Sequence, residues 1–504
     1  MSSTNSPTFL GLKGQNLIYA VTFACSVGFL LFGYDLGFMG GLTTSTEFLD
    51  VFGDPHASLL AFLVSSYEVG ALLGALFQFI MGDRFGRKPN NMAGAVIVSI
   101  GAILQATTFS LPQFLIGRII AGFGLGIMTT VIPIWLSECS MPQSRGRMMA
   151  MQLSNLIVGL ILANWLDYGL ESYAGSIQWR FPCAFQIVFC CITLVIMPFL
   201  PESPRYLCAR GDIANARISL AALRAGFPDD PVVVEEMKEI QYAISVEAEE
   251  QGSWSDVFKD NGISGFTRVA IGFAANFFQQ MSGCNVMSSL GPYVFEDSIG
   301  ILFPWWAIER FGRRPLFMIG SAGMGVCMTL SAIFVALGSQ NLGYGAAVVL
   351  YLFQSFFTLG WQSNMWIYPS EILPLKLRLR GGALAVVSQW LFTFLVVEIT
   401  PVMIDYIGYK CYVVFAIINF ATVPLVYFTF PETSKMPLEA VDLFFADRDG
   451  KRPSLWRVVQ DSLNKDFVRG VERQLQERAM LRAEKQEEIS GAEHRSEHLE
   501  LQAA

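Results

Sequence analysis

Charged residues are scarce in this chain. They make up 15% of its 504 residues, whereas a soluble domain carries about 25%. More than half of the sequence is hydrophobic, and long apolar runs recur from residue 17 to residue 430. Runs of about twenty apolar residues are long enough to cross a bilayer as helices. The composition therefore argues against a soluble globular protein and predicts an all-α, polytopic membrane protein.

The sequence also lacks the residue patterns of several function classes. It has no basic patch with interleaved aromatic residues, so a nucleic-acid partner is not expected. It shows no metal-ligand spacing, phosphate loop or nucleophile constellation, so we expect neither a cofactor nor an enzyme. Most of the nine cysteines lie inside apolar runs, at Cys25, Cys183, Cys190, Cys191, Cys284, Cys327 and Cys411. We interpret them as small buried residues.

The apolar runs predict a two-part chain. Six helices are expected in the first half, at 17–40, 58–81, 92–109, 112–136, 148–168 and 180–200. Five clear helices follow in the second half, at 266–290, 315–337, 345–369, 381–403 and 410–430. No cleavable signal pattern precedes the first helix. The predicted organisation is an N-terminal segment 1–16, a six-helix bundle 17–201, a polar helical linker 202–262, a C-terminal bundle 263–431 and a polar tail 432–504, with a mixed-charge helix near 464–488.

Basic residues predict the orientation of these helices. Arginine and lysine gather at 84–88, 145–147, 310–314 and 376–380, and the loops between these positions carry few of them. Because basic loops stay on the cytoplasmic side, both termini and the linker are expected in the cytoplasm. Five helices in the second half would instead place the tail outside.

An internal repeat shows where the second half lacks a membrane-spanning helix. DRFGRKP at 83–89 matches ERFGRRP at 309–315, and PESPR at 201–205 resembles PETSK at 431–435, both at an offset of about 230 residues. The first helices of the two halves start near 17 and 266, an offset of about 249. About twenty residues, one membrane helix, are therefore missing before the second motif.

The motifs together resemble the sugar porter branch of the major facilitator superfamily. They are FGYD (32–35), GDRFGRK (82–88), GRIIAGFGLG (117–126), PIWLSE (133–138), RGR (145–147), PESPR (201–205), QQMSGCN (279–285), ERFGRR (309–314), YPSEILPLKLRLRG (368–381) and PETS (431–434). The sequences of these motifs are similar to those of fungal sugar or polyol proton symporters. The resemblance implies two six-helix bundles, with substrate held between them and alternating access. We expect the second bundle to lack most of its second helix, which is the eighth of the family, and to keep a stub near 301–308.

Three paths could return the chain to the cytoplasmic side. The residues before the stub could cross in extended form, the preceding helix could unwind early, or all later helices could be inverted. The basic loops oppose inversion, so we predict later helices in standard positions with a stub at 303–309. A skipped or mispredicted exon is our hypothesis for the gap.

Asp35 is the predicted proton-coupling residue. It lies in an apolar run, where an isolated carboxylate is costly unless it faces a cavity or a partner, and Arg118 is the expected counter-ion. The resemblance implies that the aspartate takes and releases the proton and that the arginine modulates it. A fixed structural ion pair is the alternative.

Polar amides and indole rings are the predicted substrate contacts, because sugars bond amides through hydroxyls and stack their apolar faces on aromatic rings. The positions that match the family are Gln152, Gln279, Gln280, Asn285, Trp366, Gln389 and Trp390. Three of these amides share one helix face only if the helix breaks near Ser282–Gly283, as the resemblance implies. The alternative is that the amides join helices. Thr358 stands where some members carry an acid.

Charged residues at the cytoplasmic ends predict a gate. Arginines beside carboxylates form ion pairs and charge-assisted hydrogen bonds, which the resemblance implies are closed in the outward-facing state. The alternative is that they only orient the protein. The set is Asp83, Arg84, Arg87, Glu138, Arg145 and Glu202 in the first half, and Glu309, Arg310, Arg313, Glu371, Arg378 and Glu432 in the second.

These predictions lead to one main function and three alternatives. The main function is proton-coupled import of a hexose-like sugar or polyol across the plasma membrane by a monomer, with protons and the lipid bilayer as further partners. The alternatives are a facilitative transporter, a non-transporting nutrient sensor, and an inert product of a faulty transcript.

Overall fold

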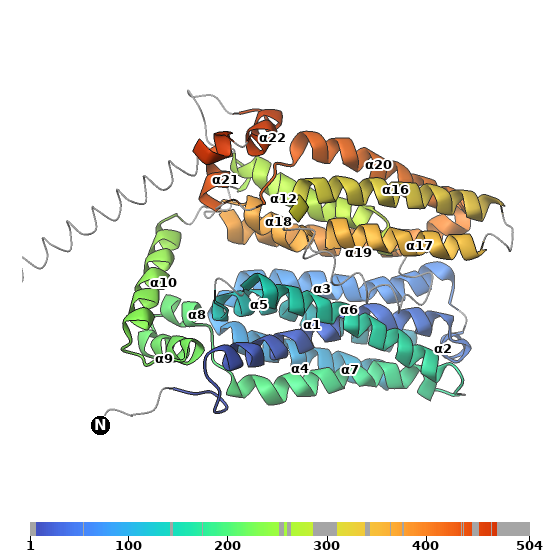
Figure 1. Ribbon diagram of the computed structural model, residues 1–504. Coiled ribbons are helices and arrows are strands. Elements are labelled where there is room, and N and C mark those ends of the chain that lie inside the picture. The colour runs from blue at the N-terminus through green and yellow to red at the C-terminus, as the bar shows by residue number, and fades with distance from the viewer. Residues whose placement is uncertain are drawn as a thin grey trace, which may run out of the picture.

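The structure is a computed structural model in which two bundles of long helices lie side by side (Figure 1). It describes residues 7–53, 55–141, 145–173, 175–250, 257–259, 264–285, 310–337, 343–362, 364–374, 377–434, 436, 438–445, 453–464 and 466–470. All regular elements in these residues are helices, apart from a single bridge between Phe9 and Leu12. The fold is all-α, as the apolar runs predicted.

The first bundle holds six long helices. They are α1 (Gln15–Thr44), α3 (Ala57–Phe85), α4 (Arg87–Ala106), α5 (Leu111–Cys139), α6 (Arg145–Leu170) and α7 (Ile177–Ile196), with short α2 (Thr46–Val51) after α1 and a 3-10 turn, Met197–Phe199, after α7. Helix α5 packs against α3 and α4. A Cβ at Gly122 of α5 would lie 2.1 Å from the Tyr67 carbonyl oxygen of α3, so only glycine allows this approach.

Three more helices follow the first bundle: short α8 (Pro204–Ala209) and α9 (Ile213–Arg224), and α10 (Pro231–Glu250), which has 20 residues. Ser203 and Asp212 cap the first two by accepting hydrogen bonds from backbone N–H groups. The Arg224 guanidinium donates to both carboxylate oxygens of Glu236, which ties α9 to α10. Arg210 of this unit donates to the Arg84 carbonyl oxygen at the end of α3, 2.7 Å away.

The second bundle holds α12 (Gly265–Met281), α16 (Arg313–Leu337), α17 (Gly343–Phe357), α18 (Asn364–Ile372), α19 (Arg378–Ile407) and α20 (Lys410–Thr429). A π-helical turn, Thr358–Gln362, joins α17 to the α18 region. Two short helices, α21 (Leu438–Phe445) and α22 (Leu455–Leu463), pack on the same end of this bundle (Figure 1). Trp456 of α22 lies against Tyr427 and Phe428 of α20.

We refer to the end of the molecule that carries Arg87 and Arg313 as the basic end, and to the opposite end, where α2 lies, as the α2 end. Helices α8 to α10, α21 and α22 all lie at the basic end (Figure 1). The bundles meet where α3 runs along α19.

Helices α12 and α16 both begin at the basic end. Arg268, near the start of α12, donates to the Ile372 carbonyl oxygen at the end of α18, and Arg313, at the start of α16, pairs with Glu371 on the same turn. The inverted arrangement of the later helices is therefore wrong, and they hold the expected direction. The expected stub at 303–309 lies outside the described residues, as does the tail helix beyond residue 470.

Seven helices in the described part of the chain are long and apolar enough to cross a membrane. They span Gln15–Thr43, Ser58–Met81, Leu111–Cys139, Ile177–Phe199, Arg313–Leu337, Arg380–Ile407 and Lys410–Thr429. Large apolar side chains are exposed on the outer faces of both bundles, for example Ile80, Ile116, Val195 and Ile417. A perimeter of this kind matches hydrocarbon rather than water.

Candidate functional site

Asp35 lies in the interior of the first bundle. Its side chain is 2% exposed and accepts a hydrogen bond of 3.0 Å from the Tyr67 hydroxyl of α3. The other carboxylate oxygen, Oδ1, is buried without a hydrogen-bond partner. A buried carboxylate with an unused oxygen has room to accept a proton or a further donor.

Arg118 of α5 reaches Asp35 through Tyr67 rather than directly. Its guanidinium lies over the Tyr67 ring, 4.5 Å from the centroid, and donates from Nη2 to the Val64 carbonyl oxygen, 3.1 Å away. Within the described residues no ion pair joins Arg118 to Asp35. The two predicted residues therefore share one partner, which keeps the charges near each other but apart.

Tyr67 and Glu68 are residues of this centre that the sequence analysis missed. Glu68 is 5% exposed, and its Oε2 has no hydrogen-bond partner. Glu68 could have been identified from the sequence in the same way as Asp35, because it is an acidic residue inside an apolar run, 58–81. The centre thus holds two buried carboxylates, one arginine and one tyrosine, from α1, α3 and α5.

Gln279, Gln280 and Asn285 converge at the end of α12. The Gln280 amide donates to the Gln279 side-chain oxygen, and Asn285 Nδ2 donates to Gln280 Oε1 over 2.8 Å. The predicted break brings them together, because α12 ends at Met281 and Gly283 has a φ of +88°. A Cβ there would lie 2.6 Å from the Met328 methyl group.

Asn419 of α20 pairs with a backbone carbonyl group that is left free where α12 breaks. Its Nδ2 donates to the Ser282 carbonyl oxygen over 2.8 Å, and also to the Phe415 carbonyl oxygen of its own helix. A freed backbone carbonyl at membrane depth is costly unless a side chain pairs with it. The sequence analysis did not identify Asn419, because its partner lies 137 residues away.

The other predicted substrate residues come from three helices. Gln152 of α6 is 1% exposed, and neither of its amide atoms has a hydrogen-bond partner. Gln389 of α19 has a buried, unpartnered Oε1, and the neighbouring Trp390 packs on Phe32 of α1 with 5.7 Å between ring centroids. Trp366 of α18 is half-buried. Trp390 therefore connects the second bundle to the core of the first.

At the basic end of the first bundle, Arg87 pairs with Glu138. Arg87 Nε and Nη2 lie 3.2 and 3.3 Å from the two carboxylate oxygens of Glu138. Glu202 accepts backbone hydrogen bonds from Arg87, Lys88 and Ser203. Burial raises the pKa of the Glu202 carboxyl above its ordinary value, although these N–H groups and the Arg87 charge act in the opposite direction.

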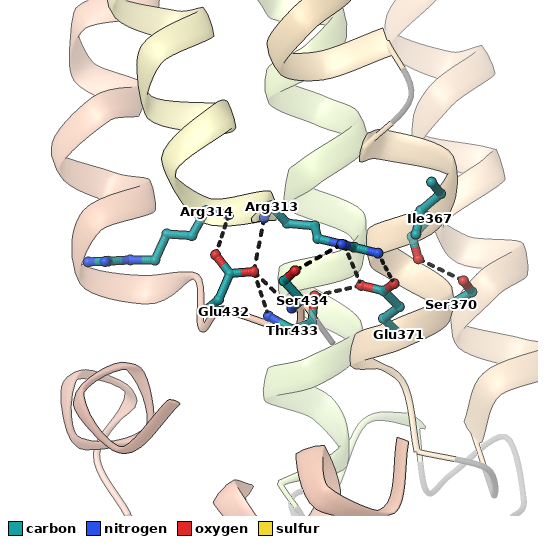
Figure 2. A network of polar contacts seen from close by, with 8 residues as sticks. All are labelled: Arg313, Arg314, Ile367, Ser370, Glu371, Glu432, Thr433 and Ser434. Carbon is teal, nitrogen blue, oxygen red and sulfur yellow. Dashed lines mark hydrogen bonds and ion pairs between the residues drawn. The ribbon is translucent and has the colours of Figure 1, made fainter. Parts of the chain in front are cut away.

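The second bundle repeats this arrangement (Figure 2). Arg313 donates to both oxygens of Glu371, over 3.1 and 2.8 Å. Glu432 accepts backbone hydrogen bonds from Arg313, Arg314 and Ser434. Thr433 adds a hydroxyl bond of 2.6 Å to Glu371. Both clusters hold a carboxylate at a helix N-terminus, where the backbone donors and the helix dipole favour negative charge.

Each cluster needs the glycine of its repeated FGR motif. Gly86 and Gly312 have φ values of +92° and +88°. A Cβ would lie 2.7 Å from a Glu202 oxygen at the first and 2.6 Å from a Glu432 oxygen at the second. The glycine therefore makes the turn and leaves space for the carboxylate.

The remaining predicted gate residues are not assigned to these clusters. The side chains of Asp83, Arg145 and Arg378, and all of Glu309, lie outside the described residues. Arg84 contributes its carbonyl oxygen to Tyr206 and Arg210 while its side chain is exposed. Arg310 is exposed just before α16.

Comparison with known proteins identifies the family. A family model described as "Sugar (and other) transporter" matches residues 20–445. The chain belongs to this sugar transporter family of the major facilitator superfamily. It is a polytopic membrane protein of a transporter family and not an enzyme.

Fungal relatives match along most of the chain. Sugar transporter STL1 of Saccharomyces cerevisiae is 35% identical over 483 residues, which cover 89% of this chain and 84% of that protein. MFS-type transporter oryC of Aspergillus oryzae is 35% identical over 467 residues, 87% of each chain.

A bacterial transporter has the same fold. The proton:xylose symporter XylE bound to 6-bromo-6-deoxy-D-glucose aligns with a TM-score of 0.72 at 23% identity, covering 85% of this chain and 99% of that one. The partially occluded inward-open form of XylE from Escherichia coli aligns with a TM-score of 0.71 at 24% identity, covering 83% of this chain and 99% of that one.

Proposed function

We propose that this chain imports a hexose-like sugar or a polyol together with protons across the plasma membrane. The observation that carries the proposal is the buried centre of Asp35, Tyr67 and Arg118 in a chain of the sugar transporter family. A carboxylate that shares Tyr67 with an arginine can lose or gain that arginine's influence when the helices move. Making and breaking the contact would couple protonation to a conformational cycle.

In this proposal the amides hold the substrate. Gln279, Gln280 and Asn285 already form one hydrogen-bonded group at a helix break, and the unpartnered atoms of Gln152 and Gln389 are free to bond sugar hydroxyls. Trp366 and Trp390 would offer faces for stacking. The two cation–carboxylate clusters at the basic end would be the cytoplasmic gate.

The orientation is part of the same proposal. Residues 1–16, 202–262 and 432–504 would lie in the cytoplasm, because the arginines of both clusters and the helices α8 to α10 occupy the same end of the molecule (Figure 1). The segments 17–201 and 263–431 would be the two bundles that alternate around the substrate.

A sensor is the second candidate function. High glucose sensor RGT2 of Saccharomyces cerevisiae is 30% identical over 470 residues, which cover 86% of this chain and 62% of that protein. A sensor would bind sugar without moving it. Uptake measurements separate the two functions directly.

The test is uptake of labelled hexoses and glycerol in a yeast host that lacks its own transporters, with external pH recorded. We expect accumulation of sugar and alkalinisation of the medium. Asp35→Asn should abolish alkalinisation, whereas Asp50→Asn, the same change at an exposed site on α2, should not alter it. Binding without uptake would support the sensor, and uptake without alkalinisation would support a facilitator.

A second version of the chain tests the shortened bundle. A helix of about twenty residues is inserted after Gly300, and surface expression is checked for both versions. Uptake by both would show that the chain works as it stands. Uptake by the repaired version alone would show that the motifs are intact and the segment between α12 and α16 is deficient.

A further inference from the structure

A serine of the first bundle is hydrogen-bonded to a glutamate of the second. The Ser65 hydroxyl of α3 donates to Glu398 Oε2 of α19 over 2.8 Å. Ser65 is fully buried and Glu398 is half-buried. A carboxylate at membrane depth is costly unless it has a partner, and here the partner lies across the boundary between the bundles.

The contact lies toward the α2 end. Ser65 is eight residues from the start of α3, and Glu398 is nine residues from the end of α19. At 1.5 Å per residue these counts place the bond about 12–14 Å from the helix ends. Asp35, nine residues before the end of α1, and Arg118, seven residues after the start of α5, lie at about the same depth.

The same turn of α3 carries the contacts of the proposed proton centre. Val64 accepts from Arg118, Ser65 donates to Glu398, and Tyr67 donates to Asp35. Three successive links thus join this turn to α5, to the other bundle and to α1. A shift of this turn changes all three.

The serine has an alternative acceptor in its own helix. Its Oγ lies 3.4 Å from the Phe62 carbonyl oxygen, a weaker geometry than the bond to Glu398. When the bundles separate, the hydroxyl keeps a partner, so opening costs the charge-assisted bond but leaves no buried hydroxyl unsatisfied.

We propose that the Ser65–Glu398 hydrogen bond is a clasp that holds the two bundles together on the α2 side. Glu398 is then a positioning residue for the state in which this side is closed. That this side faces outward, and that the closed state is the inward-facing one, rest on the proposed function. Removing the clasp shifts the population toward the outward-open state.

The experiment measures access to a reporter cysteine from outside the cell. Val69 lies one turn further from the α2 end than Ser65, on the same face of α3, and is replaced in a Val69→Cys reporter. Its labelling by a membrane-impermeant maleimide is compared in Ser65→Ala, Glu398→Ala and the double variant. Labelling of the chain without the reporter is subtracted, because Cys191 is exposed.

We expect labelling about tenfold faster in either single variant. The double variant should be no faster than the singles, since both remove one bond. The labelling rate of Glu398→Gln should lie between those of the single variants and of the wild type, because an amide oxygen still accepts a hydrogen bond from Ser65.

Two neighbouring hydroxyls provide matched controls. Ser66 of α3 donates to the Leu63 carbonyl oxygen, and Thr400 of α19 donates to the Val396 carbonyl oxygen, each within its own helix. Ser66→Ala and Thr400→Val should label at the wild-type rate. Unchanged or slower labelling in the clasp variants, or equal acceleration in the controls, would overturn the proposal. Labelling requires no sugar or proton movement, so the result stands even if uptake fails.

Discussion

The two clusters at the basic end are versions of one design, and they differ in how much surrounds the shared core. Each has an arginine that donates to both oxygens of a helix-end glutamate, and each has a second glutamate at a helix N-terminus. In the second bundle the Thr433 hydroxyl also donates to Glu371, and the Ser434 hydroxyl accepts a hydrogen bond from Arg313. The first bundle instead stacks Arg87 on Tyr206 of α8, 5.3 Å from the ring centroid.

The two clusters show which residues of the repeated motif are needed wherever the FGR turn occurs. The glycine, the arginine and the two glutamates hold the same relative geometry in both halves. The surrounding residues differ because different elements cover the clusters, α8 in the first half and α22 in the second. Ser462 of α22 accepts a hydrogen bond from the Glu432 backbone N–H, 3.1 Å away.

Removal of either arginine should produce the largest effect. Arg87→Ala and Arg313→Ala each leave a mostly buried glutamate without its charged partner, which costs about 3 kcal/mol of unfolding free energy. The two losses should be comparable, because Arg313 also donates to Ser434 and Arg87 also stacks on Tyr206. Thermal unfolding of the purified protein in detergent measures both. Arg84→Ala, with its exposed side chain, should leave the midpoint unchanged; an equal loss there would show that charge alone matters.

The glycines should give the next largest effect, equal in the two halves. Gly86→Ala and Gly312→Ala force a side chain into a positive φ, at about 2 kcal/mol, and also against a carboxylate. Gly211→Ala is the matched control, because its φ is +81° and nothing lies within 4 Å of its Cβ position. The same unfolding assay should show a smaller loss for the control. Equal losses in all three variants would mean that the carboxylates move aside.

The smallest effect should separate the halves. Thr433→Val removes a hydroxyl bond to Glu371 and costs about 1 kcal/mol. Its counterpart Ser203 caps α8 instead, by accepting from the Tyr206 N–H. In double-mutant cycles, Thr433→Val and Glu371→Gln should therefore be coupled, whereas Ser203→Ala and Glu138→Gln should be additive. Coupling in both cycles would contradict the difference between the clusters.

Sequence reasoning located most of the helices, and it grouped Arg87 with Glu138 and Arg313 with Glu371, because apolar runs and charged motifs are both visible in the local sequence. An apolar run has the length of a helix, and the repeated FGR and PE motifs place their charges at matching positions in both halves. The spacing of the amides at 279, 280 and 285 showed that they cannot share one face of a continuous helix, and the family resemblance placed the break near Gly283, where the structure brings the three amides together.

The links between distant helices were not predictable in the same way. The sequence paired Asp35 with Arg118 but could not show that Tyr67 lies between them, because that depends on how closely α5 approaches α3 at Gly122. Glu398 is one acid in an apolar run, and nothing local to it indicates Ser65, 333 residues earlier. Asn419 is a similar case.

The bond from Asn419 to the Ser282 carbonyl oxygen has a consequence for how selectivity can be exchanged between related transporters. The direction in which Asn285 points depends on a break that a residue in α20 supports. A chimera that swaps residues 265–285 alone would transfer the amides without the support that orients them. Under the proposed function, sugar preference should follow the swap only when the donor's residue at position 419 travels with it, so the proposed substrate site depends on two segments together.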